Sequence, residues 1–284
     1  MPASPTLRRR RLSQQLDALR QAAGMTVDAA AKAAKKLRPD RPWSAAKITR
    51  LENREWRRLQ SDDVLALLDV YGVTDKAERD AYVRLALEAS QTGWWVGYKD
   101  VLGAGAYVDL ETEASRIRTY QPLVIPGLLQ TEEYARAVVR GHTVTDDREV
   151  ERRVEARMMR QQILSRTDGP RLWAIVDEGV LRKVPESAMR EQVRHLIEIQ
   201  ASRRVQFQII PDAAGPHAGM GGSFVILDFP SDPSTVYLEH SMSGLFPEDS
   251  VELEHYETVY DHLHASALSV EESTAYLKRL LIDH

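Results

Sequence analysis

The stretch WSAAKITRLEN, residues 43–53, decides how the first part of the chain folds. Ser44 is a suitable helix N-cap because its hydroxyl can accept a hydrogen bond from one of the first backbone N–H groups. Ile48 and Leu51 lie three residues apart, so both point to one side of a helix and into a core. The side chains left on the outer side are Ala45, Ala46, Lys47, Thr49 and Arg50. This pattern predicts a short helix with small and basic residues on its exposed face.

Helical patterns surround this stretch on both sides. Thr26 can cap an alanine-rich helix, whereas the two prolines of RPDRP (38–42) predict an extended loop in place of a tight turn. Apolar residues at helical spacing predict further helices over residues 7–23, 27–37, 61–71 and 75–89. The beginning of the chain is therefore predicted to be an all-α domain of about five helices.

Charge is divided unevenly along the chain. The net charge is −4, but residues 1–60 carry 15 Lys and Arg against 5 Asp and Glu, a balance of +10. Residues 61–284 carry the other 23 basic and 37 acidic residues, a balance of −14. A basic first part beside an acidic remainder indicates that only the first part binds a polyanion. The alternative is a chance clustering of solvated charge.

The composition changes near residue 92, where TGWWVGYKDVLGAGA (92–106) combines paired tryptophans with glycines. We place a domain boundary here, with a first domain in residues 1–91 and a second in residues 92–284. Trp94, Trp95 and Tyr98 are interpreted as a docking element packed on the second domain. The alternative is an aromatic platform that stacks on a ligand.

The second domain mixes helical and strand patterns. Strands are predicted over 171–177, 204–211, 222–230 and 235–240, and helices over 108–120, 131–139, 147–165, 185–200, 250–268 and 270–282. Ser269 and Glu272 have the spacing of a capping box at the start of the last helix. The predicted fold class of this part is α+β, with a small, mostly antiparallel or mixed sheet of four or five strands.

Two segments carry a resemblance to a known type of DNA-binding domain. AAGMT (22–26) and KITRLEN (47–53), with the helix before them, resemble the phage-repressor (Xre/Cro-type) helix-turn-helix over about residues 7–75. The resemblance implies that 44–53 forms the recognition helix. It also implies a structural ion pair between Arg20 and Glu52. The sequence departs from the pattern in its turn, which is several residues longer and lacks the usual glycine.

The same resemblance implies which residues contact double-stranded DNA. Ala45, Ala46 and Arg50 lie where base edges are read, and an arginine can bind a guanine through two hydrogen bonds. The positions expected at the DNA backbone are Thr26, Arg38, Arg41, Ser44, Lys47, Thr49, Arg54, Arg57 and Arg58. Phosphate contacts position a protein on DNA, whereas base contacts specify the sequence.

A second resemblance covers nearly the whole chain. Segments such as YQPLVIPGLLQTEEYARAVV (120–139) and VQFQIIPDAAGPHAGMGGSFVILDF (205–229) resemble a large actinobacterial family of regulators that includes WhiJ-like proteins. The resemblance implies a DNA-binding transcriptional regulator, often encoded beside a small acidic partner protein and sometimes described as antitoxin-like. It leaves open what the second domain senses.

Patterns that would indicate catalysis or metal binding are sparse in the second domain. The sequence has no GxSxG, HExxH, P-loop or Rossmann GxGxxG pattern. His217, Gly219 and Gly221 form a candidate ligand or partner loop, and the alternative is a plain connection between strands. Asp177 and Glu178 form a candidate acid/base pair, although carboxylates after a strand also cap helices. We expect neither enzyme activity nor a metal or cofactor.

The sequence therefore predicts a sequence-specific DNA-binding transcriptional regulator, a repressor, whose second domain forms a homodimer and binds a small acidic partner protein or a ligand. The alternatives are an antitoxin-like module whose DNA binding is autoregulatory, and an enzyme in the second domain. The chain has no cysteine, and no apolar run approaches the length that crosses a bilayer. We expect a cytoplasmic bacterial protein with no membrane contact.

Replacing Arg57 and Arg58 together by alanine tests the predicted phosphate contacts. We expect weaker binding to every DNA sequence and a smaller dependence of affinity on salt, because phosphate contacts release counterions. Affinity measured at several salt concentrations reports both effects. A change in sequence preference alone would contradict the phosphate assignment.

Overall fold

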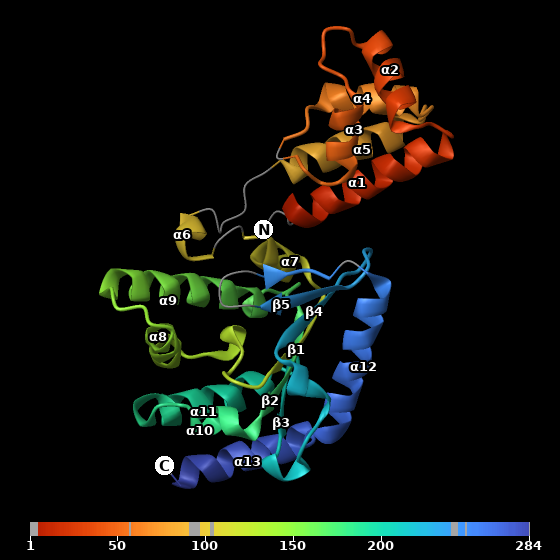
Figure 1. The fold of residues 1–284 in the computed structure, drawn as a ribbon. Coiled ribbons are helices and arrows are strands. Elements are labelled where there is room, and N and C mark those ends of the chain that lie inside the picture. Colours follow the sequence, from red (N-terminus) through yellow and green to blue (C-terminus); the bar gives the residue numbers. More distant parts are fainter. Residues whose placement is uncertain are drawn as a thin grey trace. The chain divides into compact units, whose positions relative to one another are not determined.

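The structure is a computed structural model that describes residues 5–56, 58–90, 97–102, 105–239, 244–247 and 249–283. The chain divides into two compact units, Met1–Val96 and Gly97–His284, and each is described by itself (Figure 1). The expected boundary at residue 92 and the side chains of Trp94 and Trp95 lie outside the described residues.

The described part of the first unit consists of helices joined by loops. Its helices are α1 (Pro5–Ala22), α2 (Val27–Leu37), α3 (Ala45–Glu52), α4 (Ser61–Val70) and α5 (Lys76–Ala89) (Figure 1). Leu12 and Leu16 of α1, Ile48 of α3 and Leu67 of α4 are at most 1 % exposed and belong to one apolar core. The all-α fold expected from the helical spacing is therefore confirmed.

Side-chain caps fix where three of these helices begin. Thr26 Oγ1 accepts a hydrogen bond from the Ala29 N–H at 3.2 Å, and Ser44 Oγ accepts one from the Lys47 N–H at 3.1 Å. Asp75 caps α5 in the same way. Each cap satisfies a backbone donor that has no partner within its own helix. As expected from the prolines, a loop of residues 38–44 separates α2 from α3.

The second unit is an α+β domain built on a mixed sheet. Its strands are β1 (Arg116–Gln121), β2 (Arg171–Asp177), β3 (Val205–Ile210), β4 (Phe224–Asp228), β5 (Thr235–Glu239) and β6 (Gly244–Leu245). They lie in the order β3-β2-β1-β4-β5-β6. The first three are parallel to one another, and β4 runs antiparallel to β1, β5 to β4, and β6 to β5. Of the two sheet types expected, the mixed one is correct, with six strands instead of four or five.

Helices cover both sides of this sheet. The helices of the second unit are α6 (Lys99–Leu102), α7 (Ala106–Glu113), α8 (Glu132–Gly141), α9 (Asp147–Gln161), α10 (Glu178–Arg182), α11 (Glu186–Gln200), α12 (Ser250–Ser266) and α13 (Val270–Asp283), with short 3-10 turns η2 (Gly127–Leu129), η3 (Gln162–Ser165), η4 (Asp212–Ala214) and η5 (Ala218–Gly221). Figure 1 shows α8–α11 on one side of the sheet and α12 on the other. This follows from the crossovers, because α8 and α9 connect β1 to β2, and α10 and α11 connect β2 to β3. The capping box at Ser269 and Glu272 is present, with both reciprocal hydrogen bonds formed.

The helix predicted over residues 108–120 is wrong in its second half. Helix α7 ends at Glu113, and β1 begins at Arg116 and lies inside the sheet. The prediction followed Leu110, Ala114 and Ile117, whose spacing fits a helix but does not exclude a short buried strand. The arginine at position 118 also obscured the strand, because its guanidinium is buried and donates to Asp228 of β4 at 2.8 Å and to Glu257 of α12 at 3.0 Å.

One backbone position in the loop between α8 and α9 is strained and can be relieved. Thr143 adopts a left-handed φ of 64°, which is unfavourable for a β-branched residue. Replacing Thr143 by glycine should raise the free energy of unfolding by about 1 kcal/mol, measured by urea-induced unfolding of the full chain. Thr145→Gly is the matched control, because Thr145 is exposed in the same loop without a left-handed φ. Equal effects of the two substitutions would contradict the strain argument.

Candidate nucleic-acid interface

The position of α3 is set by an ion pair with α1. Arg20 Nε donates to Glu52 Oε1 at 2.6 Å, and Arg20 Nη2 donates to Glu52 Oε2 at 3.0 Å. The Arg20 guanidinium also donates to the Met25 carbonyl at 2.8 Å and to Asp17 at 2.6 Å. The two side chains are only 13 % and 12 % exposed. The hydrogen bond with Glu52 outweighs burial and raises the pKa of Arg20, so α1, the turn after it and the end of α3 are joined by one permanently charged group.

A buried hydroxyl of α1 also holds the C-terminal end of α3 by a hydrogen bond. Ser13 of α1 is fully buried, and its Oγ donates to the Leu51 carbonyl at 2.5 Å. The same oxygen accepts a hydrogen bond from Trp56 Nε1 at 3.0 Å. Because buried polar groups are costly unless they are hydrogen-bonded, this arrangement favours a single position of the α3 C-terminus.

The basic residues before and within α3 are largely engaged by acidic residues at the start of α4. Arg41 Nη2 donates to Asp62 at 2.9 Å, and Lys47 Nζ donates to Asp63 at 3.0 Å. The ammonium of Lys47 also lies 4.0 Å from the centre of the Trp43 ring. Arg38 pairs with Asp40 at 3.2 Å. For these cations the structure favours an anchoring role, in which the loop of residues 38–44 is held against α4, over the free phosphate contacts expected from the resemblance.

The exposed face of α3 has fewer residues than the sequence indicated, because Ala45 and Lys47 are half-buried. Ala46, Thr49, Arg50 and Asn53 are exposed, and their spacing of i, i+3, i+4 and i+7 places them on one face. Ala45 is half-buried. Among the described residues, Arg50 is held only by a hydrogen bond from Nε to the Ala46 carbonyl at 3.3 Å, so its guanidinium can reach a neighbouring surface. Sequence reasoning missed Asn53, although the same helical spacing that selected Arg50 would have found it.

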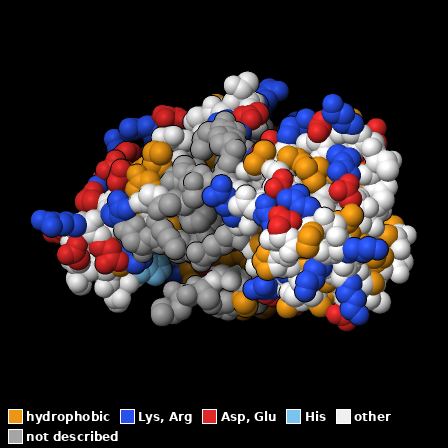
Figure 2. Space-filling view, turned by 90° about the horizontal axis from the view of Figure 1, so that it is seen from above, with side chains coloured by type: hydrophobic (Ala, Val, Ile, Leu, Met, Phe, Trp, Pro, Cys, Tyr) orange, Lys and Arg blue, Asp and Glu red, His pale blue; other side chains and the backbone are white. Residues whose placement is uncertain are grey.

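The other predicted contacts fall into different environments. Thr26 and Ser44 use their hydroxyls to cap α2 and α3, which places both at helix N-termini. Arg54 is half-buried with a left-handed φ of 65°, and Arg58 is exposed. Arg57 lies outside the described residues. On the face shown in Figure 2, Lys and Arg side chains are interspersed with Asp and Glu and form no continuous basic patch.

In the second unit, the structure brings His217 to the carboxyl end of the parallel strands. His217 Nε2 lies 3.4 Å from Asp177 Oδ1 at the end of β2, and Tyr120 OH of β1 donates to the same oxygen at 2.9 Å. Burial, followed by the hydrogen bond to Asp177, raises the pKa of Tyr120. A Cβ at Gly219 would lie 2.4 Å from the Tyr120 ring, so this glycine is required by close packing. Gly221 ends the same short turn, η5, without such a neighbour.

Asp177 and Glu178, the candidate acid/base pair of the sequence, accept hydrogen bonds from different groups in the structure. Glu178 Oε2 accepts from the Asp212 N–H at 2.9 Å, and its Oε1 accepts from Tyr276 OH at 3.0 Å. The two carboxylates therefore have separate sets of partners. Tyr98, the described member of the expected aromatic element, donates from its hydroxyl to Glu155 of α9 at 2.8 Å.

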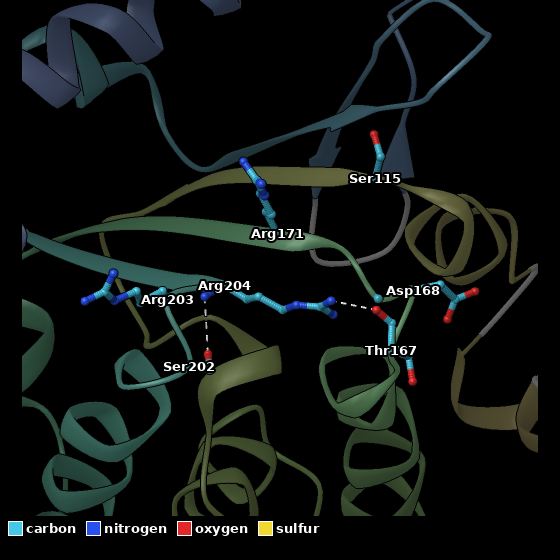
Figure 3. A pocket seen from close by; sticks show the side chains of 8 residues that line it. Ser115, Thr167, Asp168, Arg171, Ser202, Arg203 and Arg204 are labelled. Carbon is cyan, nitrogen blue, oxygen red and sulfur yellow. Dashed lines mark hydrogen bonds between the residues drawn. The ribbon is translucent and has the colours of Figure 1, made fainter.

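A pocket of about 510 Å³ lies at the opposite end of the parallel strands (Figure 3). Three arginines line it, Arg171 at the start of β2 and Arg203 and Arg204 just before β3. In Figure 3 the Arg204 side chain points toward Thr167, whose carbonyl accepts from Arg204 Nη2 at 2.6 Å. Nothing in the sequence patterns indicated this pocket, because its residues come from three separate connections.

The fold and the exposed face of α3 define the first unit as a helix-turn-helix DNA-binding domain. A family model described as a helix-turn-helix domain matches residues 11–82, in agreement with this assignment. A second family model, described as a domain of unknown function (DUF5753), matches residues 104–279. Since this match covers more than half of the chain, the chain belongs to that family. With a helix-turn-helix domain at its start, it is a DNA-binding regulator.

Comparisons with curated proteins and with solved structures give no match. Among the helices formed by the described residues, none has the length and apolar character needed to span a bilayer. No group of three or more histidines and acids suited to a metal ion occurs within the described part of the chain.

Replacing Glu52 by alanine tests whether the Arg20–Glu52 pair holds α3 in place. The change removes the bidentate partner of a mostly buried guanidinium, which keeps Asp17 and the Met25 carbonyl, and should lower the free energy of unfolding of the first unit by about 1.5–3 kcal/mol. Hydrogen exchange of the α3 amides in the full chain measures this loss locally. Glu55→Ala is the control, because Glu55 is exposed and only three residues away. If α3 keeps wild-type protection in the Glu52 variant, the pair has no such role.

Proposed function

We propose that this protein is a sequence-specific repressor that reads the major groove of double-stranded DNA with the exposed face of α3. The observation that carries the proposal is a small exposed face, formed by Ala46, Thr49, Arg50 and Asn53, on a helix whose C-terminal end is held by side chains of α1. The major groove admits an α-helix and displays a distinct pattern for each base pair. Small side chains allow the helix to approach closely, and rigid placement gives Arg50 a defined target.

Base recognition is divided between two polar groups on this face. Arg50 is suited to a guanine, whose O6 and N7 accept two hydrogen bonds from a guanidinium. Asn53 follows it on the same face, and a side-chain amide suits adenine. Ala46 can offer apolar contact to a thymine methyl group. These roles extend the readout beyond Ala45, Ala46 and Arg50 and reduce the part of Ala45, which is half-buried.

Phosphate contacts come from cations that the fold leaves accessible. Arg58 follows α3 and is exposed, as are Lys32, Lys35 and Lys36 on the outer face of α2. Arg41 and Lys47 contribute less, because acidic residues of α4 already neutralise them. A contact with DNA by Arg41 or Lys47 would require these ion pairs to exchange. The nonspecific part of the affinity should thus be smaller than the +10 balance of residues 1–60 suggests.

We further propose that the protein is a WhiJ-like regulator of the actinobacterial type that works in the cytoplasm as a homodimer. Residues 97–284 supply dimerisation and bind a ligand or a small acidic partner protein, and they act by binding and not by catalysis. The sequence segments that resemble this family support the proposal, and so does the acidic balance of −14 outside the first 60 residues. A two-fold dimer would present two copies of α3 to successive major grooves.

Genome-wide mapping of bound sites tests the proposal as a whole. We expect a limited set of sites that share one sequence, and a measured mass of the purified protein that equals two chains. Adding the product of a neighbouring gene for a small acidic protein should raise this mass if that product is the partner. Uniform occupancy of the genome would contradict sequence-specific binding, and a monomeric mass on DNA would contradict the dimer.

Replacing Arg50 by alanine tests base recognition by α3. The affinity for a mapped site should fall by about 1–3 kcal/mol, and preference should relax at one base pair, because one bidentate contact to a base is lost. Competition binding with DNA changed at each position measures both effects. Arg84→Ala is the matched control, because Arg84 is exposed on α5 in the same unit and the charge change is the same. Unchanged affinity and preference in the Arg50 variant would refute its role.

A further inference from the structure

The pocket at the amino ends of the parallel strands is unusually rich in arginine. It has a volume of about 510 Å³ and is lined by Arg171, Arg203 and Arg204, with Asp168 as its one acidic lining residue. Three connections supply the lining, before β1, before β2 and before β3. The volume is within the range of small-molecule sites, which is about 300–1,000 Å³.

Part of this charge has a structural explanation. Arg204 donates to the carbonyls of Arg166 at 2.8 Å and Thr167 at 2.6 Å, and so binds together two of the connections. Asp168 accepts from Arg166 at 3.0 and 2.7 Å. These hydrogen bonds lower the pKa of Asp168, which stays ionised but is neutralised by a residue that is not part of the lining.

Two of the arginines remain without such a role. The side chains of Arg171 and Arg203 are exposed, and none of the described residues pairs with their guanidinium groups. In Figure 3 neither side chain carries a dashed line, in contrast to Arg204. The lining therefore includes two accessible guanidinium groups whose charge no described neighbour balances, and in Figure 3 their side chains point in different directions, so both would have to turn toward a shared ligand.

The backbone at Arg203 is a second, independent observation. Its φ is 55°, in the left-handed region where glycine or asparagine is usual. A structural turn would be more stable with glycine at this position, so an arginine there is held at a cost in stability. Strained residues of this kind cluster at functional sites, where the side chain has a use that offsets the strain.

We propose that this pocket binds a small molecule that carries phosphate groups, with Arg171 and Arg203 as its phosphate ligands. Guanidinium groups match phosphate oxygens with two parallel hydrogen bonds, and they keep their charge at any physiological pH. The Thr167 hydroxyl in the lining supplies a further polar group, whereas the Ser115 hydroxyl already donates to the Asp228 carbonyl at 3.1 Å. The inference rests on the proposed function, in which residues 97–284 bind a ligand, and it names the chemical class of that ligand.

Calorimetric titration of the full chain, without DNA, tests the inference with ATP, AMP and inorganic phosphate as probes and citrate as a phosphate-free anion. We expect ATP to bind. Replacing both Arg171 and Arg203 by alanine should weaken ATP binding by about tenfold per arginine, which is typical for hydrogen bonds to a charged group. Arg190→Ala with Arg194→Ala is the matched control, because both arginines are exposed on α11 and the charge change is the same.

Three outcomes would overturn the inference. They are the absence of binding by all three phosphate probes at millimolar concentration, equal weakening of ATP binding in the two double variants, and citrate binding as tightly as ATP.

Replacing Arg203 alone by glycine separates the role of its side chain in binding from its effect on folding stability. We expect this variant to melt at a higher temperature and to bind ATP more weakly. Unchanged ATP affinity would show that Arg203 has only a structural role.

Failure of this inference and failure of the proposed function can be told apart. The Arg171 and Arg203 double variant should bind a mapped DNA site with wild-type affinity when no phosphate compound is present, because the substitutions leave the first unit unchanged. ATP binding without any specific DNA site would contradict the proposed function alone. Specific DNA binding without phosphate binding would contradict the pocket assignment alone.

Discussion

The buried ion pair between Arg20 and Glu52 is the constraint on which the DNA-binding surface depends. It joins α1, the turn at Met25 and the end of α3 through one guanidinium group. A buried pair adds little net stability compared with an apolar contact, but removing Glu52 would take from the Arg20 guanidinium the partner that ties it to α3 and leave only Asp17 and the Met25 carbonyl. Its value lies in fixing one orientation of α3. Ser13 and Trp56 hold the same end of that helix, so the exposed face is presented without rearrangement.

The positive charge available for binding DNA is smaller than the basic excess counted in residues 1–60, because acidic residues of α4 pair with part of it. Asp62 and Asp63 at the start of α4 engage Arg41 and Lys47, and these ion pairs place the long loop that replaces the usual tight turn. The helix dipole favours acidic residues in the first turn of a helix. Asp62 and Asp63 therefore stabilise the start of α4 and also hold the loop of residues 38–44. Less of the basic excess is then available for nonspecific phosphate binding.

Much of the first unit was predictable because its helices carry local signals. Caps at Thr26 and Ser44 and the apolar spacing within each helix are read directly from the sequence. The ion pair of Lys47 with Asp63 was not predictable, since it joins residues that are 16 positions apart in the sequence. In the second unit, β1 was missed because Arg118 is buried there and neutralised by partners more than a hundred residues away. The pocket around Arg171 was not predicted either, because its lining residues come from three connections that are far apart in the sequence.

Selection from a library of random double-stranded DNA by the full-length protein tests the central claim most directly. The account predicts enrichment of one sequence made of two half-sites related by two-fold symmetry and separated by about one helical turn, 10–10.5 base pairs. It also predicts that the glutamate-to-alanine change at position 52 abolishes this enrichment. Recovery of unenriched DNA, with binding that depends on salt and not on sequence, would contradict the assignment of α3 as the helix that reads DNA.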